Sequence, residues 1–155
     1  MRQTVPTTTQ DNKKTARRKS GRALGPALVV EDDGLVAMDI ADALGEAGAA
    51  PVTTCASVAE AMAQLEQSVP SILVLDVHLA DRGDGWALAE LAIQLGENSP
   101  LIIFTTATPE AIPDTAAGLG RVLPKPFSTA ALVSLIQQER PRGILGRIRS
   151  ALAGQ

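Results

Sequence analysis

Short apolar runs alternate with longer stretches of helical periodicity along most of this chain. The runs carry the large aliphatic side chains typical of buried strands, and they cover residues 27–30, 51–55, 72–76, 101–105 and 121–124. Between them, apolar residues recur three or four positions apart, which predicts helices near 35–47, 58–65, 86–96 and 109–117 and a last helix after Ser128. Strand and helix therefore alternate five times.

Single residues refine the helices and strands that the pattern predicts. Ser57, followed three residues later by Glu60, is typical of the capping box that opens a helix. Gly48 predicts the end of the first helix. Pro113 lies inside the fourth predicted helix, where a proline is poorly tolerated. The run at 51–55 is the most polar of the five, so we expect it at an edge of the sheet.

The alternation predicts the fold class. Strands joined through helices by short, right-handed connections form a parallel sheet with helices on both faces. We therefore expect an α/β protein with a doubly wound, five-stranded parallel sheet. The predicted buried faces of the first two helices include Leu35 and Met62, respectively.

Charge divides the chain into three parts. Residues 1–26 hold seven Lys/Arg and one Asp, and residues 140–155 hold four Arg and no acid, whereas residues 27–139 hold 16 acids and three Lys/Arg. We expect a disordered basic arm, one domain over 27–139, and a short basic tail that forms a helix or frays. The acidic domain is not expected to bind nucleic acid on its own account.

Composition excludes several other classes of protein. With two Phe, one Trp and no Tyr, the chain has no aromatic platform for stacking bases. The single Cys55 excludes an intramolecular disulfide and suits a reducing compartment. No apolar run approaches the roughly 20 residues that span a bilayer, and the amino terminus does not resemble a secretory signal. We expect a cytoplasmic protein without a membrane span.

Polar residues interrupt the apolar framework where the predicted strands end. Glu31 and Asp32 follow the first strand, Asp76 ends the third, Thr106 follows the fourth and Lys125 follows the fifth. In a doubly wound sheet these ends share one rim, where ligands bind. Carboxylates held close together repel one another, and Mg²⁺, which takes oxygen ligands, removes that repulsion. A lysine beside them supplies positive charge for a phosphoryl group.

The motifs VVEDD, LVLD, TA and KPF, at the ends of the first, third, fourth and fifth strands, resemble those of the receiver domain of two-component response regulators. The resemblance covers residues 27–139 and implies a flavodoxin-like sheet with strand order 2-1-3-4-5. It also implies phosphorelay signalling. A sensor histidine kinase or a histidine phosphotransfer protein would donate the phosphoryl group, and output would pass through a downstream protein target.

The resemblance assigns a role to each matching residue. Asp76 corresponds to the phosphoacceptor, Lys125 to the phosphoryl-binding lysine and Thr106 to the switch hydroxyl, with Thr105 as the alternative. The metal ligands would be Glu31, Asp32, Asp76 and the backbone carbonyl of His78, holding Mg²⁺. Asp33, next to the acidic pair, is expected to be merely exposed.

The sequence departs from the common receiver pattern at three places. The loop at 79–86 is one residue longer and lacks the usual proline, and Val122 stands where many receivers carry an aromatic residue. The run FTTAT, residues 104–108, partly resembles a receiver subgroup with a Phe-Ala-Thr-Gly signature and a short fourth helix. These departures bear on how the switch is coupled to the surface, and they leave the phosphorylation chemistry unchanged.

Two other functions compete with a signalling phosphoacceptor. A phosphohydrolase with an aspartate nucleophile would need an Asp-x-Asp pair after the first strand and a cap domain, and neither is present in this sequence. A receiver-like interaction module without turnover would not need a matching residue at every site position. This sequence has one at each, which argues against that alternative. We expect no enzyme activity beyond self-phosphorylation and self-dephosphorylation, and no DNA-binding domain. The sequence leaves open a weak homodimer.

Overall fold

The computed structural model describes residues 23–79 and 85–139. The expected basic tail and all of the expected arm except residues 23–26 lie outside the described residues. In chain order the elements are β1 (Gly25–Val30), α1 (Gly34–Glu46), β2 (Ala49–Cys55), α2 (Val58–Gln67), β3 (Ile72–Asp76), α3 (Trp86–Leu95), β4 (Leu101–Thr106), the 3₁₀ turn η1 (Pro109–Ala111), α4 (Asp114–Ala117), β5 (Arg121–Pro124) and α5 (Thr129–Glu139).

The five strands form one parallel sheet in the order β2-β1-β3-β4-β5. This confirms the predicted fold class and strand order. The polar strand β2 lies at one edge, as its composition predicted, and β3 lies at the centre with all five of its residues buried. Since apolar side chains cover both faces of β3, its carboxyl end is the natural place for a site between the two helical layers.

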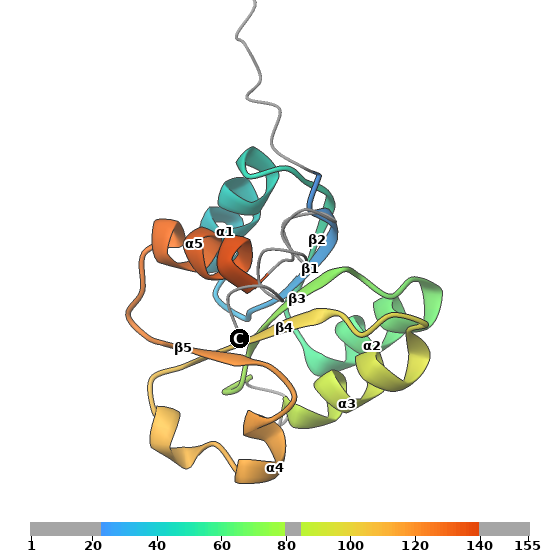
Figure 1. Cartoon of the computed structure of the whole chain (residues 1–155), viewed down its shortest axis with the longest axis vertical. Helices are drawn as coiled ribbons and strands as arrows, with labels where there is room; N and C mark the ends of the chain where they lie inside the picture. Colours follow the sequence, from blue (N-terminus) through green and yellow to red (C-terminus); the bar gives the residue numbers. More distant parts are fainter. Residues whose placement is uncertain (1–22, 80–84, 140–155) are drawn as a thin grey trace, which may run out of the picture.

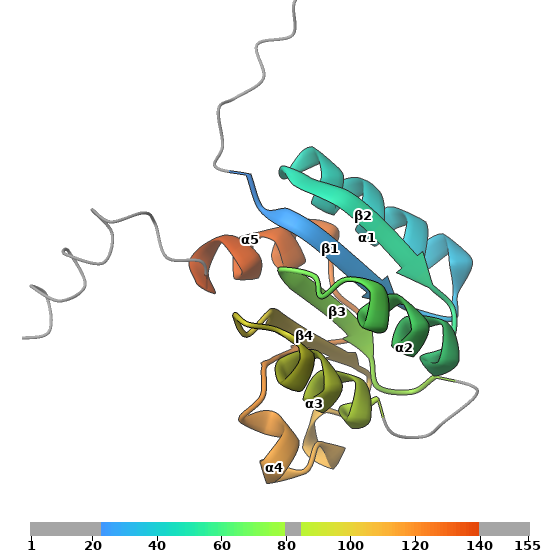
Figure 2. The same ribbon diagram turned by 90° about the vertical axis from the view of Figure 1, so that its right-hand side faces the viewer.

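Two helical layers cover the sheet. Helices α1 and α5 lie on one side, and α2 and α3 lie on the other (Figures 1 and 2). Side chains alternate between the faces along each strand, so that Val74 and Ile103 pack in the core under α1 and α5. Leu75 and Phe104 pack in the opposite core with residues of α2 and α3. This alternation later decides which face each site residue occupies.

Helix boundaries follow the predicted signals closely. Ser57 caps α2, since its Oγ accepts a hydrogen bond from Glu60 N at 3.2 Å, and Glu60 Oε2 accepts one from Ala56 N at 3.1 Å. Helix α1 ends just before Gly48, whose φ of +108° few residues other than glycine adopt. The first strand begins at Gly25, two residues earlier than predicted.

The fourth predicted helix is interrupted. Instead of one helix over 109–117, the chain forms the 3₁₀ turn η1 and then the single turn α4. Pro113 immediately precedes α4, a position that a proline tolerates, whereas a continuous helix would place it in the interior. The segment between β4 and β5 therefore presents little helical surface.

Two predicted core residues are exposed. Leu35 on α1 is 76% exposed and Met62 on α2 is 39% exposed, because each helix buries a narrower stripe than the apolar periodicity predicted. The buried stripes are Ala37, Ile40 and Leu44 on α1 and Val58, Ala61 and Leu65 on α2. Among the described residues, no helix has both the length and the apolar character needed to cross a bilayer.

Candidate functional site

The carboxyl ends of three strands bring an acid, a second acid and a lysine together. Asp76 is the last residue of β3, Glu31 follows β1 directly, and Lys125 follows β5 directly. Both carboxylates are 4% exposed, which is unusual for acids and requires compensating partners. The site thus joins segments as far apart in sequence as residues 31 and 125.

Lys125 supplies that compensation. Its Nζ lies 3.0 Å from Asp76 Oδ2 and 3.1 Å from Glu31 Oε2, so one ammonium bridges both acids. The backbone also contributes, since Asp33 N donates to Glu31 Oε1 at 3.1 Å and His78 N donates to Asp76 Oδ1 at 2.9 Å. Each carboxylate is therefore held by one charged and one backbone donor.

The pKa values reflect this balance. Burial raises the pKa of Glu31, and the nearby charge of Asp76 adds to the rise, while hydrogen bonds from Asp33 N and Lys125 oppose it. Burial alone would lower the pKa of Lys125, but its hydrogen bonds to Asp76 and Glu31 outweigh that effect and raise it. Lys125 is thus held as a cation between the two acids.

A third carboxylate completes an acidic cluster. Glu31, Asp32 and Asp76 each offer one oxygen, and these oxygens all lie within 4.8 Å of one another. Glu31 and Asp76 are buried whereas Asp32 is exposed, so the cluster opens toward solvent on the Asp32 side. Three oxygen donors of this kind, with one side open to water, fit a hard divalent cation such as Mg²⁺.

Asp33 has a structural task that the sequence analysis missed. Its Oδ1 accepts hydrogen bonds from Leu35 N at 3.0 Å and Val36 N at 3.2 Å, which makes it the N-cap of α1. Its signal was present in the sequence, because an aspartate directly before a helical pattern is a typical cap. The cap fixes the turn that carries Glu31 and Asp32.

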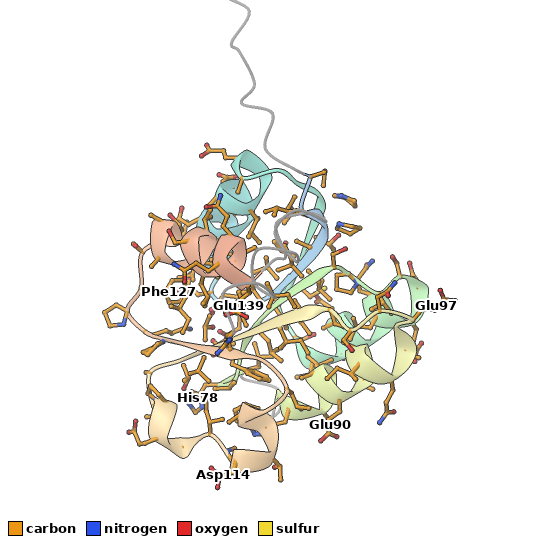
Figure 3. The ribbon with its side chains drawn as sticks, viewed as in Figure 1. His78, Glu90, Glu97, Asp114, Phe127 and Glu139 are labelled. Carbon is orange, nitrogen blue, oxygen red and sulfur yellow. The ribbon has the colours of Figure 1, made fainter. Side chains whose placement is uncertain are left out.

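A hydrogen-bonded group of side chains connects the loop after β3 to the loop after β4. His78 is exposed, and its Nε2 lies 3.0 Å from Thr108 Oγ1. Thr108 N donates to Thr106 Oγ1 at 3.0 Å, and the two threonine hydroxyls lie 3.4 Å apart. Figure 3 labels His78 on the side of the molecule that carries α4. The contact between His78 and Thr108 joins residues 30 positions apart.

The two adjacent threonines of β4 face opposite sides of the sheet. By the alternation along the strand, Thr106 shares the face of Phe104, and Thr105 shares the face of Ile103 under α1 and α5. Both threonines are buried, at 0% and 1% exposed. Only the Thr106 hydroxyl joins the group that reaches His78, so the two threonines have different surroundings.

Comparison with known proteins places this arrangement in a family. The sequence model of the response regulator receiver domain matches residues 27–137. This chain belongs to the response regulator receiver family. Receivers are signalling domains of two-component systems, and the fold and the acidic rim described above agree with that membership.

Individual relatives are moderately similar to this receiver. Transcriptional regulatory protein PdtaR of Mycobacterium tuberculosis is 30% identical over 112 residues, which make up 71% of this chain and 54% of PdtaR. This chain thus spans about half the length of that curated relative. A response regulator receiver protein from Sinorhizobium medicae is 25% identical, with a TM-score of 0.60, and the match covers 76% of this chain and 94% of that one.

A third relative, the response regulator PhyR from Brucella abortus, is 26% identical with a TM-score of 0.62. That match covers 84% of this receiver and 51% of PhyR. The receiver fold therefore occurs both in chains of about its own length and in longer proteins.

A groove opens beside the site on the face covered by α1. It has a volume of about 410 Å³, and its walls are mainly apolar. Residues of α1, of the loop after β4, of the connection between β5 and α5 and of the start of α5 line it, namely Val36, Asp39, Ile40, Ala107, Lys125, Pro126, Phe127 and Thr129. Figure 3 labels Phe127 on that connection. The Lys125 side chain thus separates the acidic cluster from an apolar surface.

Proposed function

We propose that this receiver is the phosphoacceptor of a two-component phosphorelay and that Asp76 takes the phosphoryl group. The observation that carries the proposal is the pair of short contacts from Lys125 Nζ to Asp76 Oδ2 and Glu31 Oε2. A buried acid that ends a central strand, paired to the one described lysine, is a nucleophile with a charge-compensating partner already in place.

The chemical step is an in-line displacement at phosphorus. A carboxylate oxygen of Asp76 forms the new P–O bond, and the P–N bond of a phosphohistidine on the donor protein breaks. The bonding pair goes to the imidazole nitrogen, which leaves as neutral imidazole because the other ring nitrogen carries a proton. Transfer of this kind depends mainly on positioning and charge compensation.

Lys125 provides one part of that compensation. As negative charge moves from Asp76 onto the phosphoryl oxygens, the ammonium follows it, since Nζ already lies within hydrogen-bond distance of the carboxylate. His78 N keeps its hydrogen bond to Oδ1 and so orients the carboxyl group. Both groups are supplied by the ends of strands, which hold them rigidly.

The second part would come from a metal. Glu31, Asp32 and Asp76, with the backbone carbonyl of His78, would hold Mg²⁺, and the bound ion would neutralise charge between the acids and the phosphoryl oxygens. The exposed position of Asp32 leaves an open side for water and substrate oxygens.

Thr106 is proposed as the switch. Its hydroxyl is engaged by Thr108 N in the structure described here, so a move toward a phosphoryl group on Asp76 would break that hydrogen bond and shift the loop after β4. The shifted surface would include η1 and α4, through which a downstream protein target would be bound.

The proposed donor is a sensor histidine kinase or a histidine phosphotransfer protein. Two large apolar side chains of α1 are exposed near the acidic rim, Leu35 at 76% and Met38 at 62%. Apolar residues this exposed next to a site are typical of a protein-binding surface. A donor that packs on α1 would carry its phosphohistidine to Asp76.

The test is phosphate uptake at a defined residue. Acetyl phosphate and Mg²⁺ should label the protein once, and mass spectrometry should place an acid-stable, base-labile phosphate on Asp76. Asp76→Asn should abolish labelling, because an amide oxygen is a poor nucleophile, whereas Asp39→Asn on α1 should not. Full labelling of the Asp76→Asn protein would refute the assignment, and turnover of a simple phosphomonoester would favour a phosphohydrolase instead.

A further inference from the structure

Thr105 presents an unexplained buried hydroxyl. The residue is 1% exposed, and its Oγ1 makes no hydrogen bond to any of the residues that the structure describes. Burying a hydroxyl without a partner is unfavourable, and valine would fill the same volume without that cost. A threonine here therefore calls for a partner that the resting arrangement does not provide.

The strand register places this hydroxyl level with the site. Thr105 is paired with Asp76 on β3 and with Leu123 on β5. Residues paired across parallel strands point to the same face, so Thr105 and Asp76 both face α1 and α5. The hydroxyl lies within the sheet row that contains the proposed phosphoacceptor.

Lys125 must pass over this row. The lysine follows β5, whereas its partners Asp76 and Glu31 stand at the ends of β3 and β1. Strand β4 lies between β5 and β3, and neighbouring strands are about 4.8 Å apart, so the extended Lys125 side chain crosses β4 and meets the Asp76 side chain, which reaches toward it from β3. On this face, the last residue of β4 beneath that path is Thr105.

The donor count of the ammonium leaves room for this hydroxyl. An ammonium has three N–H donors, and Lys125 uses two of them, toward Asp76 and Glu31. We propose that Thr105 is a positioning residue for Lys125, whose Nζ donates a hydrogen bond to Thr105 Oγ1 when the ammonium turns from Glu31 toward a phosphoryl group on Asp76. The inference rests on the proposed function and adds a residue to it.

The physical reason is the movement of charge. Once an oxygen of Asp76 is bonded to phosphorus, negative charge lies on the phosphoryl oxygens, and the ammonium follows it. A donor that leaves Glu31 must find another acceptor in a partly buried place, because an unsatisfied charged donor is costly. Thr105 offers a neutral acceptor at the right level, and its own O–H remains free to donate. Thr105 then positions Lys125 on one face of β4, and Thr106 acts as the switch on the other.

The experiment compares isosteric variants by binding and by stability. The phosphoryl analogue formed from beryllium and fluoride, with Mg²⁺, is titrated into the wild type, Thr105→Val and Thr105→Ser. Thr105→Val should weaken binding about tenfold or more, the loss expected for a hydrogen bond to a charged group, and Thr105→Ser should restore it. Thr54→Val makes the same substitution on the exposed part of edge strand β2 and should bind as the wild type does.

A double-mutant cycle connects the effect to the lysine. In a Lys125→Met background, Thr105→Val should cost nothing further in binding, because the donor that it serves is gone. Without metal or analogue, Thr105→Val should melt at the wild-type temperature or above it, since it removes an unsatisfied hydroxyl. If Thr105→Val melts lower, the comparison passes to Thr105→Ala and Thr105→Ser, which differ by the hydroxyl alone.

The outcomes separate this inference from the proposed function. If the wild type neither binds the analogue nor takes phosphate, the proposed function fails. The inference is overturned if the wild type binds the analogue and Thr105→Val binds it equally well. It is also overturned if Thr105→Val lowers the affinity by the same factor in the Lys125→Met background as in the wild type, because Thr105 would then have no role in positioning the lysine. A selective loss that serine restores and that depends on Lys125 supports it.

Discussion

The Nε2 atom of His78 lies 3.0 Å from Oγ1 of Thr108, across the two loops that follow β3 and β4. The same Thr108 holds the Thr106 hydroxyl through its backbone N–H. Because His78 N also donates to Asp76 Oδ1, the loop around His78 contacts both the proposed phosphoacceptor and the proposed switch. The imidazole ring is thus anchored on the loop whose backbone contacts Asp76.

We expect the anchored imidazole ring of His78 to slow hydrolysis of the phosphorylated protein. Because Thr108 contacts Nε2 of His78, the ring is held in place, where it would shield an acyl phosphate on Asp76 from water. His78→Ala should speed dephosphorylation about tenfold, which corresponds to a lowering of the hydrolysis barrier by about 1.4 kcal/mol. Loss of phosphate from purified phosphoprotein, measured by mass spectrometry over time, tests this.

Thr108→Val provides the matched variant. It keeps the shape of the side chain and removes the hydroxyl that holds the ring, so it should speed decay less than His78→Ala does. The double variant should resemble His78→Ala alone, because both changes remove the same contact. Unchanged decay in His78→Ala would show that the ring does not shield the acyl phosphate.

A second prediction concerns the packing of the chain before β5 against β4, the strand that carries Thr106. A Cβ on Gly120 would clash with the backbone oxygen of Ile102 on β4, whereas a Cβ on Gly118 would meet nothing within 4 Å. Gly120→Ala should therefore lower the free energy of unfolding by about 2–4 kcal/mol, as overpacking against rigid backbone does. Gly118→Ala should leave it within about 0.5 kcal/mol. Urea denaturation of the two variants compares these costs directly, and equal stabilities would mean that β5 moves easily away from β4.

Much of this fold could be predicted from pattern alone, for identifiable reasons. The continuous apolar run of β3 is buried on both faces, and the polar β2 lies at the edge, because burial dictates residue type strongly in parallel sheets. The buried face of a helix follows less directly from the sequence. Leu35 has the spacing of a core residue but lies in the first turn of α1 beyond the sheet, where periodicity says nothing of what covers it.

The site divides in the same way. The positions of Asp76, Glu31 and Lys125 at one rim follow from topology, since parallel strands end together. The contact of His78 with Thr108 and the isolation of the Thr105 hydroxyl depend on loop conformation and on side-chain packing. Such details have no sequence period, and three-dimensional contacts are needed to show that Thr105 and Thr106 have different surroundings.

A third prediction separates the two adjacent aspartates. Asp32→Asn removes one of the three clustered carboxylates, so the affinity for Mg²⁺ should fall about tenfold or more, and the metal-free protein should be no less stable because repulsion is relieved. Asp33→Asn removes the same charge one residue later but keeps an N-cap, since asparagine caps as well as aspartate. Its metal affinity should stay close to that of the wild type.

Thermal melting with increasing Mg²⁺ provides the readout for both variants. The metal raises the melting temperature in proportion to its binding free energy, so the shift should be large for the wild type and Asp33→Asn and small for Asp32→Asn. The same small shift in both variants would indicate that bulk negative charge, and not a ligand at residue 32, governs metal binding.

The last prediction concerns the dependence of stability on pH when Lys125 is removed. Lys125→Met keeps the aliphatic stem and deletes the cation that bridges Asp76 and Glu31. In the wild type, folding raises the pKa of Lys125 above its ordinary value of 10.5. The ion pairs of Lys125 therefore stabilise the fold fully below pH 10.5, and this contribution is lost as the pH rises through the raised pKa of the folded state. At neutral pH its loss should cost about 1–3 kcal/mol.

Glu31 sets the lower end of this pH window. Burial raises its pKa above the ordinary 4.5, so the folded state favours its neutral form and loses stability as pH rises through the raised value. Without the cation that rise becomes larger, so the variant should lose stability more steeply than the wild type between pH 4 and neutrality. The difference between the two proteins should be small near pH 4 and complete by pH 7.

Urea denaturation in a metal chelator, from pH 4 to 8, measures the difference. Arg121→Met, at the start of the strand that Lys125 follows, is the control. It removes a cation whose side chain is 57% exposed and pairs with Glu139 at the surface, so its cost should stay within about 0.5 kcal/mol at every pH. A cost for Lys125→Met that does not change with pH would assign the contribution of this residue to the packing of its stem. A cost that grows with pH, as expected here, assigns it to the two buried carboxylates that Lys125 holds.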